Sequence, residues 1–399
     1  MRYDFDRNID RNNTNSSKWD KNEKLFGRED VLDMWVADMD FPSPKPVMEA
    51  LKNRLEHPLF GYSFPPDSLY EAIIDRMERV YGWQIEKEWI IFTPGVITGL
   101  YAAIDALTVS GDEVVLQPPV YRPFYGAITN NGCQVVENQL KLEGEHYVMD
   151  YDDLCEHLTT SKDGYPSVTH RIQGLILCNP HNPGGRVWSV DELEQLADIC
   201  CDNDVAIFSD EIHCDLLVGD ASHTVMASLS PEVERQTVTF MAPSKTFNLA
   251  GLKASFAIIP NEQWREKINY ARQGQGSVNE LGLVAMEAAL RDGDDYIEQL
   301  NTYLKNNVEF FCEKINNIPG LRAVRPQGTY LVWVDMRKLG LEDDELQKLL
   351  IEEAQVATNP GFMFGSGGEG FHRFNLACPK SRVEKCVRRI EKAVRKTTA

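Results

Sequence analysis

Residues 175–213 read LILCNPHNPGGRVWSVDELEQLADICCDNDVAIFSDEIH, and this stretch is the strongest indication of the fold. It contains two short apolar runs, at 175–178 and 205–208, with a helical pattern between them. We expect that helix to begin with a capping box formed by Ser189 and Glu192. A strand, a helix and a second strand in this order are the unit that builds parallel sheets. Because both runs are continuously apolar, we expect helices to cover both faces of the sheet.

Further apolar runs of strand length lie on either side of this unit, at 89–92, 114–116, 135–136, 238–241 and 254–259. The first of them leads through a turn of small residues into a stretch, 97–107, whose apolar residues follow helical spacing. The sequence therefore predicts an α/β fold with a mostly parallel central sheet and helices on both faces.

The two ends of the chain have a different character. Residues 1–50 are polar and then rich in proline. From about residue 285 helical patterns dominate, interrupted by apolar runs at 329–334 and 371–376, and the second run alternates as a half-exposed strand does. We expect a large α/β domain from residues 51–284, and a smaller α+β domain formed by residues 1–50 and 285–399 together.

The composition excludes some classes of partner. The 399 residues include 41 Lys and Arg against 61 Asp and Glu, which gives a formal net charge of −20. Nucleic acids and anionic membranes attract clustered positive charge, so we expect neither as the main partner. Nine scattered cysteines without a CxxC pair indicate neither a metal site nor a disulfide framework. No segment resembles a secretory signal or a membrane span, and we expect a cytoplasmic protein.

Four of the predicted strands are followed, at their carboxyl ends, by residues suited to bind a ligand. Ligands bind at these ends in open α/β sheets. Gly95 precedes a helix N-terminus that suits a phosphate group, and Asn182, Asp210 and Lys245 follow three other strands. Taken singly, each of them could belong to a turn, a helix cap or the solvated surface. Together, a lysine, an aspartate and an asparagine beside a phosphate site are the groups that pyridoxal phosphate needs.

Seven motifs spread over nearly the whole chain carry a closer resemblance. They are Trp35–Phe41, Gly61-Tyr62, Pro118–Tyr121, Asn182-Pro183-x-Gly185, Ser209–His213, Ser244–Leu252 and Arg373–Pro379. With these motifs in this order, the chain resembles the fold-type I, class I/II aminotransferase superfamily of pyridoxal phosphate enzymes. More narrowly, it resembles the MalY/PatB-like cystathionine β-lyase (C–S lyase) branch. The resemblance implies that the large domain, residues 51–284, binds the cofactor.

The resemblance also implies the roles of individual residues. Lys245 would form the Schiff base with the cofactor and remove the α-proton of the substrate. Asp210 would pair with the pyridinium nitrogen, and Asn182 would donate a hydrogen bond to the phenolic oxygen. Tyr121 would stack on the ring, and we count it with Lys245 and Asp210 as catalytic.

The phosphate site implied by the resemblance comprises Gly95, Val96, Ile97 and Ser244, joined by Tyr62 from the other subunit of a homodimer. Two cofactor-site positions depart from the aminotransferase pattern. His213 stands where those enzymes usually place a tyrosine near the phenolic oxygen, and this histidine agrees with the C–S lyase branch. Lys253 stands where they usually place a phosphate-binding arginine, and it supplies the same charge.

Substrate binding would fall to Arg373, Asn182 and Asp38. The guanidinium of Arg373 would take the α-carboxylate in a bidentate pair, which a lysine could not replicate. Asp38 would lie near the substrate entrance.

Simpler interpretations of some of these residues stay open. Tyr62 and Tyr121 could be packing aromatics, and His213 could be a core histidine. Arg373 could form a surface salt bridge, and Asp38 could cap a turn.

The resemblance implies a pyridoxal phosphate-dependent β-lyase that converts cystathionine or a related cysteine S-conjugate to a thiol, pyruvate and ammonia, a reaction that belongs to methionine biosynthesis. An aminotransferase of the class I/II type would share every residue named above except those that determine specificity. A regulatory protein that retains the cofactor site is a further alternative. The sequence identifies neither the leaving thiol nor the physiological substrate.

Overall fold

The computed structural model describes residues 2–159 and 172–397, which include all the predicted site residues. Its centre is a seven-stranded sheet with the strand order β2-β10-β9-β8-β7-β3-β4. The strands are β2 (Ile90–Thr93), β3 (Glu113–Leu116), β4 (Gln134–Glu137), β7 (Ile172–Cys178), β8 (Ala206–Asp210), β9 (Thr237–Met241) and β10 (Ser255–Ile258). Strand β10 runs antiparallel to both of its neighbours, β2 and β9, and the other neighbouring pairs of this sheet are parallel. The prediction of a mostly parallel sheet is confirmed.

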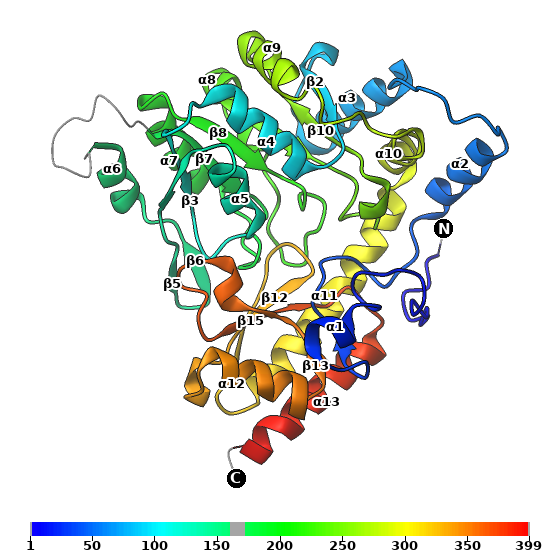
Figure 1. Cartoon of the computed structure of the whole chain (residues 1–399), viewed down its shortest axis with the longest axis vertical. Coiled ribbons are helices and arrows are strands. Elements are labelled where there is room, and N and C mark those ends of the chain that lie inside the picture. The colour runs from blue at the N-terminus through cyan, green and yellow to red at the C-terminus, as the bar shows by residue number, and fades with distance from the viewer. Residues whose placement is uncertain (1, 160–171, 398–399) are drawn as a thin grey trace.

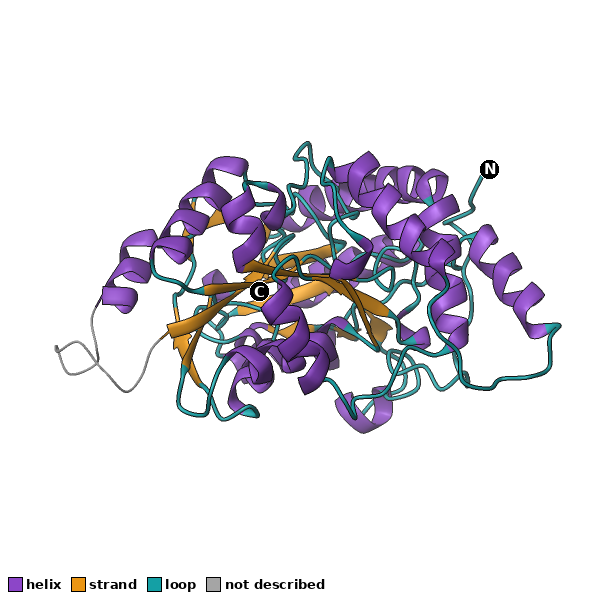
Figure 2. Ribbon diagram, turned by 90° about the horizontal axis from the view of Figure 1, so that it is seen from above, coloured by secondary structure: helices purple, strands orange, loops and turns teal. Residues whose placement is uncertain are grey.

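Helices cover both faces of this sheet, as Figure 2 shows from above. They are α4 (Val96–Leu107), α5 (Pro123–Thr129), α6 (Tyr151–Thr159), α7 (Val190–Asp202), α8 (Pro231–Gln236) and α9 (Glu262–Ala271). Along β7, Ile176 belongs to one hydrophobic cluster, whereas Leu175 and Leu177 belong to another. Alternate residues of a strand point to opposite faces, so both faces of β7 are buried, and its residues 175–178 are all apolar for that reason.

A second sheet lies beneath the first in Figure 1 and has the antiparallel order β11-β12-β15-β14. Its strands are β11 (Arg322–Val324), β12 (Leu331–Asp335), β14 (Asn359–Pro360) and β15 (Phe371–Asn375). The helices of the C-terminal part of the chain are α10 (Glu280–Asp292), α11 (Asp294–Asn316), α12 (Asp343–Lys348) and α13 (Lys380–Thr397). Helix α11 runs from the level of the large sheet down to the small one (Figure 1).

The N-terminal segment joins the C-terminal part of the chain. Strand β1 (Leu32–Asp33) pairs in parallel with β13 (Val356–Ala357), and Phe5 is buried in the same hydrophobic cluster as residues of α11 and α13. The remaining elements are α1 (Asn22–Phe26), α2 (Lys45–Leu55), α3 (Asp67–Tyr81) and the hairpin of β5 (Lys141–Glu143) and β6 (His146–Val148). No helix in residues 2–159 and 172–397 is long and apolar enough to span a membrane.

One expectation about the small sheet was wrong. The alternation in residues 371–376 predicted a half-exposed strand, but every residue of β15 is buried. Its polar side chains face protein groups instead of water: the ring of His372 pairs with the Thr358 hydroxyl at 2.8 Å, and Asn375 donates to the backbone oxygen of Asp38 at 2.7 Å. An alternating pattern shows which residues need polar partners, and here these partners lie elsewhere in the chain.

The start of α7 confirms the predicted capping box. The Ser189 hydroxyl accepts a hydrogen bond from the backbone N–H of Glu192 at 3.3 Å, and the Glu192 carboxylate accepts from the backbone N–H of Ser189 at 2.8 Å. Both N–H groups lie in the first turn, where the helix itself offers no acceptor. This cap positions the helix that follows the Asn182 loop.

We expect Ser189→Ala to lower the free energy of unfolding by about 1 kcal/mol, because the N–H of Glu192 loses its acceptor. Urea unfolding followed by circular dichroism measures this change. Ser189→Thr keeps a capping hydroxyl and serves as the matched control, with most of the stability retained. Equal stability of the alanine and threonine variants would contradict the contribution of the cap.

Candidate active site

A cavity of about 400 Å³ lies at the carboxyl ends of the parallel strands β7, β8 and β9, the position at which such sheets bind ligands. Its lining includes ten of the residues predicted from the sequence: Gly95, Val96, Ile97, Tyr121, Asn182, Asp210, His213, Ser244, Lys245 and Lys253. They come from segments far apart in the sequence, and the parallel arrangement of the strands brings them together.

One end of the cavity is formed by the N-terminus of α4. Gly95 occupies the N-cap position and has no side chain that could accept a hydrogen bond from the first turn. The free N–H groups and the positive end of the helix dipole therefore face the cavity, beside Ser244 and Lys253. Backbone donors, a hydroxyl and an ammonium group form a donor set that fits a phosphate.

Asp210 ends β8 at the base of the cavity and is buried. Its carboxylate accepts the backbone N–H of Ile212 at 3.1 Å. Burial raises the pKa of Asp210 to about 7, against the smaller opposing effects of this hydrogen bond and of the charge on Lys245. A cationic group placed against this carboxylate would favour its ionised form.

Lys245 projects from the segment that follows β9. Its Nζ atom donates a hydrogen bond to the backbone oxygen of Ala37 at 2.7 Å. Burial, and then the positive charge of Arg373, lower the pKa of Lys245 to about 8. Near neutral pH this amine is therefore unprotonated far more often than an ordinary lysine, and the unprotonated form is the one that acts as a nucleophile or a base.

Arg373 projects from β15 and is buried. It donates to the side-chain oxygens of Asn182 at 2.9 Å and Asn359 at 2.7 Å, and to the backbone oxygen of Trp35 at 3.1 Å. The ring of Phe364 lies 5.0 Å from its guanidinium carbon. Within the described residues, the groups that accept hydrogen bonds from Arg373 are all neutral, its Nε atom has no partner, and burial lowers its pKa to about 10. A buried cation with neutral partners fits an incoming carboxylate, and the interpretation as a surface salt bridge does not hold.

His213 and Tyr121 both line the cavity. His213 is buried, and its ring lies 6.1 Å from that of Tyr330. Burial and the charges of Lys245 and Arg373 keep the pKa of His213 well below its usual range, so the ring is neutral. Its Nδ1 atom has no hydrogen-bond partner within the described residues. Burial also raises the pKa of Tyr121, which keeps its hydroxyl protonated.

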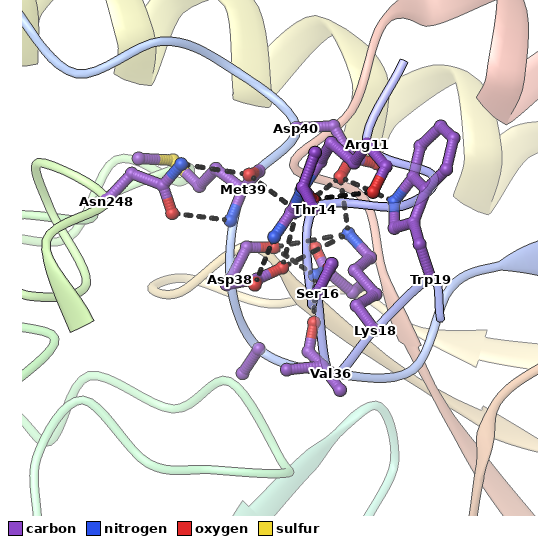
Figure 3. Close-up of polar contacts among 12 residues, drawn as sticks. Arg11, Thr14, Ser16, Lys18, Trp19, Val36, Asp38, Met39, Asp40 and Asn248 are labelled. Atoms are coloured by element: carbon purple, nitrogen blue, oxygen red, sulfur yellow. Dashed lines mark hydrogen bonds and ion pairs between the residues drawn. The ribbon is translucent and has the colours of Figure 1, made fainter. Parts of the chain in front are cut away.

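Three predicted residues do not line the cavity: Arg373, which contacts the cavity residue Asn182, and also Asp38 and Tyr62. The carboxylate of Asp38 is held by Arg11, with an Nη2–Oδ2 distance of 2.8 Å (Figure 3). Tyr62 is fully exposed, in the extended segment between α2 and α3, and it does not line the cavity of its own chain.

Sequence reasoning missed the backbone contacts of the Trp35–Phe41 motif. Ala37 and Trp35 contact Lys245 and Arg373 through carbonyl oxygens, for which the sequence holds no side-chain signal.

Comparisons with known proteins identify the family to which this chain belongs. The family model described as aminotransferase class I and II matches residues 29–390. Cystathionine beta-lyase PatB of Bacillus subtilis is 42% identical over 98% of this chain and 99% of its own length. Among solved structures, a PLP-bound protein of Clostridium difficile assigned as an aminotransferase has a TM-score of 0.94 and 42% identity, and covers 98% of this chain and 100% of its own. The PLP-bound C–S lyase of Staphylococcus hominis has a TM-score of 0.89 and 31% identity, and the match covers 99% of this chain and 98% of its own. This protein therefore belongs to the family of class I and II aminotransferases.

Proposed function

We propose that this protein is a pyridoxal 5'-phosphate-dependent carbon–sulfur β-lyase acting on cystathionine or related cysteine S-conjugates. One observation carries the proposal: an amine of lowered pKa, Lys245, lines the same cavity as the buried carboxylate of Asp210 and is close enough to the buried guanidinium of Arg373 for its charge to act on the amine. Within the described residues, neither Asp210 nor Arg373 forms an ion pair. The similarity to PatB, a cystathionine β-lyase, supports the choice of reaction.

The cavity fits the cofactor at each of its polar groups. The N-terminus of α4, with Ser244 and Lys253, would hold the phosphate, and Asp210 would hold the ring nitrogen. Asn182 and His213 would lie toward the phenolic oxygen, Tyr121 would cover the ring face, and Lys245 would bind the cofactor covalently. When bound, the cofactor withdraws electrons from the α-carbon of the substrate.

The chain's own groups would orient the substrate and move its protons. Arg373 would bind the α-carboxylate with two parallel hydrogen bonds and so place the α-hydrogen toward Lys245. The Nζ atom of Lys245 would take up the α-proton, which allows the thiolate to leave from the β-carbon. One water is consumed overall, and the products are the thiol, pyruvate and ammonia.

Both parts of the fold contribute to this site. Lys245, Asp210 and Asn182 come from the region of the large sheet, whereas Arg373 comes from the small sheet. We propose that residues 51–284 form the cofactor-binding domain and that residues 1–50 and 285–399 form the second domain, a division supported by the pairing of β1 with β13.

An aminotransferase is the second candidate, and the assignment of the Clostridium difficile structure favours it. The residues discussed above suit either reaction, because both begin with removal of the α-proton. The two candidates differ in their co-substrate: a transaminase needs a 2-oxo acid, whereas a β-lyase does not.

We expect pyruvate to form from cystathionine, cystine or an S-alkyl cysteine without an added 2-oxo acid. Lys245→Ala should lower kcat by more than roughly 10³-fold and abolish the visible absorbance of the lysine-bound cofactor, because both roles of the amine are lost. Lys267→Ala removes an exposed lysine and is the matched control. A strict requirement for 2-oxoglutarate would assign the protein to the transaminases, and full activity of Lys245→Ala would overturn the site.

We expect Arg373→Lys to lower kcat/KM by roughly 10–100-fold, mainly through KM, because a lysine keeps the charge but not the bidentate geometry. Steady-state pyruvate release measures both constants. Arg395→Lys, at an exposed arginine of α13, should change neither. An unchanged KM in Arg373→Lys would show that the α-carboxylate binds elsewhere.

We also propose that the protein is a homodimer with Tyr62 completing the phosphate site of the partner. The segment between α2 and α3 exposes four large side chains: Leu59 by 69%, Phe60 by 58%, Tyr62 by 112% and Phe64 by 81%. Contiguous exposed apolar side chains of this size are typical of interfaces. Nothing in the described part of the chain covers Tyr62, which agrees with a role in a second subunit.

Subunit mixing tests this arrangement. Tyr62→Ala and Lys245→Ala are each expected to be inactive or nearly so. When they are unfolded together and refolded in equal amounts, half of the dimers should be mixed, each with one intact site, which restores about a quarter of the wild-type activity. Refolding each variant alone is the control. No recovery in the mixture, or a monomer in sedimentation, would contradict the shared site.

A further inference from the structure

The backbone of residues 35–41, here called loop 35–41, contacts two groups of the candidate active site. The carbonyl oxygen of Ala37 accepts hydrogen bonds from Lys245 Nζ at 2.7 Å and from the Tyr330 hydroxyl at 3.0 Å. The carbonyl oxygen of Trp35 accepts from Arg373 Nη2 at 3.1 Å. The position of this loop therefore determines where the amine and the guanidinium point.

Side chains from the site's own elements hold the inner side of loop 35–41. Asn375, on the same strand as Arg373, donates to the backbone oxygens of Val36 at 2.5 Å and Asp38 at 2.7 Å. Asn248, three residues after Lys245, donates to the oxygens of Met39 and Phe41 at 2.9 Å each and accepts the Met39 N–H at 3.0 Å. The loop has no strand or helix of its own, so such contacts maintain its shape.

Arg11, from the N-terminal segment, holds the outer side of the same loop (Figure 3). Its two terminal nitrogens bind the two carboxylate oxygens of Asp38 at 3.1 and 2.8 Å. One of them also donates to Asp40 Oδ1 at 2.8 Å and to the backbone oxygen of Met39 at 3.2 Å. A single guanidinium thus binds three consecutive residues of loop 35–41. Its planar fork pairs with both carboxylate oxygens of Asp38, a geometry that an ammonium group does not reproduce.

A fully buried lysine lies beneath this contact. Lys18 is 0% exposed, and its Nζ atom lies 3.1 Å from Asp40 Oδ1 and 3.3 Å from the backbone oxygen of Asp38. Burial opposes the ionisation of Asp40, but the charges of Lys18, Arg382 and Arg11 together keep its pKa below the usual value. Asp40 is therefore ionised, and the outer side of the loop is held by charge-assisted hydrogen bonds.

We propose that Arg11 is a positioning residue of the active site: through Asp38 and Met39 it holds loop 35–41 so that Ala37 and Trp35 present their carbonyl oxygens to Lys245 and Arg373. This inference rests on the proposed function of the cavity. Arg11 itself does not line the cavity. It acts from the N-terminal segment, through the loop, on groups that would contact the substrate.

Hydrogen exchange of the holoenzyme tests the structural half of the proposal. In Arg11→Met, the amides of residues 38–40 should exchange at least about 10-fold faster than in the wild type, because the outer contacts of the loop are lost. The amides of Leu32 and Met34 bond to the backbone near β13 and should not change, which provides an internal control. Arg7→Met removes an exposed arginine from the same segment and is the matched variant.

The kinetic half separates positioning from general destabilisation. Arg11→Met should raise KM for cystathionine roughly 5–20-fold with a smaller change in kcat, because Arg373 loses the fixed orientation of one of its acceptors. Arg11→Lys keeps the charge without the fork and should recover part of the loss. A uniform rise in exchange across the chain, or a loss of kcat with unchanged KM, would identify a merely structural role and overturn the proposal.

The two proposals fail in distinguishable ways. If the wild type forms no pyruvate from any S-substituted cysteine while Arg11→Met still loosens residues 38–40, the lyase assignment fails and the role of Arg11 in holding the loop stands. If the wild type is an active lyase and Arg11→Met matches Arg7→Met in both exchange and KM, the positioning role is refuted and the lyase assignment stands.

Discussion

The buried amine of Lys245 lies beside two other buried charged groups of the candidate active site, Asp210 and Arg373. Lys245 has left bulk water, so its charged form is destabilised and its pKa falls to about 8, with the backbone oxygen of Ala37 as its hydrogen-bond acceptor. The nearby carboxylate of Asp210 and guanidinium of Arg373 are also buried, and each departs from its usual pKa in the direction that burial dictates. Three such groups near one cavity are costly for stability, and a ligand that carries a cation, a phosphate and a carboxylate would satisfy them together.

Segments from different parts of the chain hold these buried groups in place. The large sheet supplies Asp210 and the segment of Lys245, the small sheet supplies Arg373, and the N-terminal segment supplies the contacts that hold loop 35–41. Because Ala37 and Trp35 contribute only carbonyl oxygens, their placement depends on neighbours rather than on their own side chains. The site is therefore assembled from distant parts of the sequence. The substitution of a residue outside the cavity is expected to change the placement of its groups.

The sequence predicted most of the large sheet because its central strands, such as β7 at residues 175–178, are buried on both faces and therefore carry continuous apolar runs. Ten of the residues it proposed line the cavity: Gly95, Asn182, Asp210 and Lys245 were proposed because they follow strands or precede a helix, and the other six came from the resemblance to the family. It was wrong about the exposure of β15, where the polar residues contact other segments of the chain rather than solvent. The contacts of Asp38 with Arg11 were also missed, because nothing in a linear pattern pairs two residues across an irregular loop.

Local patterns alone determined the α/β class, the capping box of α7 and the candidate groups at the strand ends, since each depends on residues close together in the chain. Other properties arise only when distant segments meet. They include the lowered pKa of Lys245, the neutral partners of Arg373 and the exposure of Tyr62. The physical reason is that burial, charge proximity and hydrogen-bond satisfaction are properties of an environment, and the folded chain creates that environment.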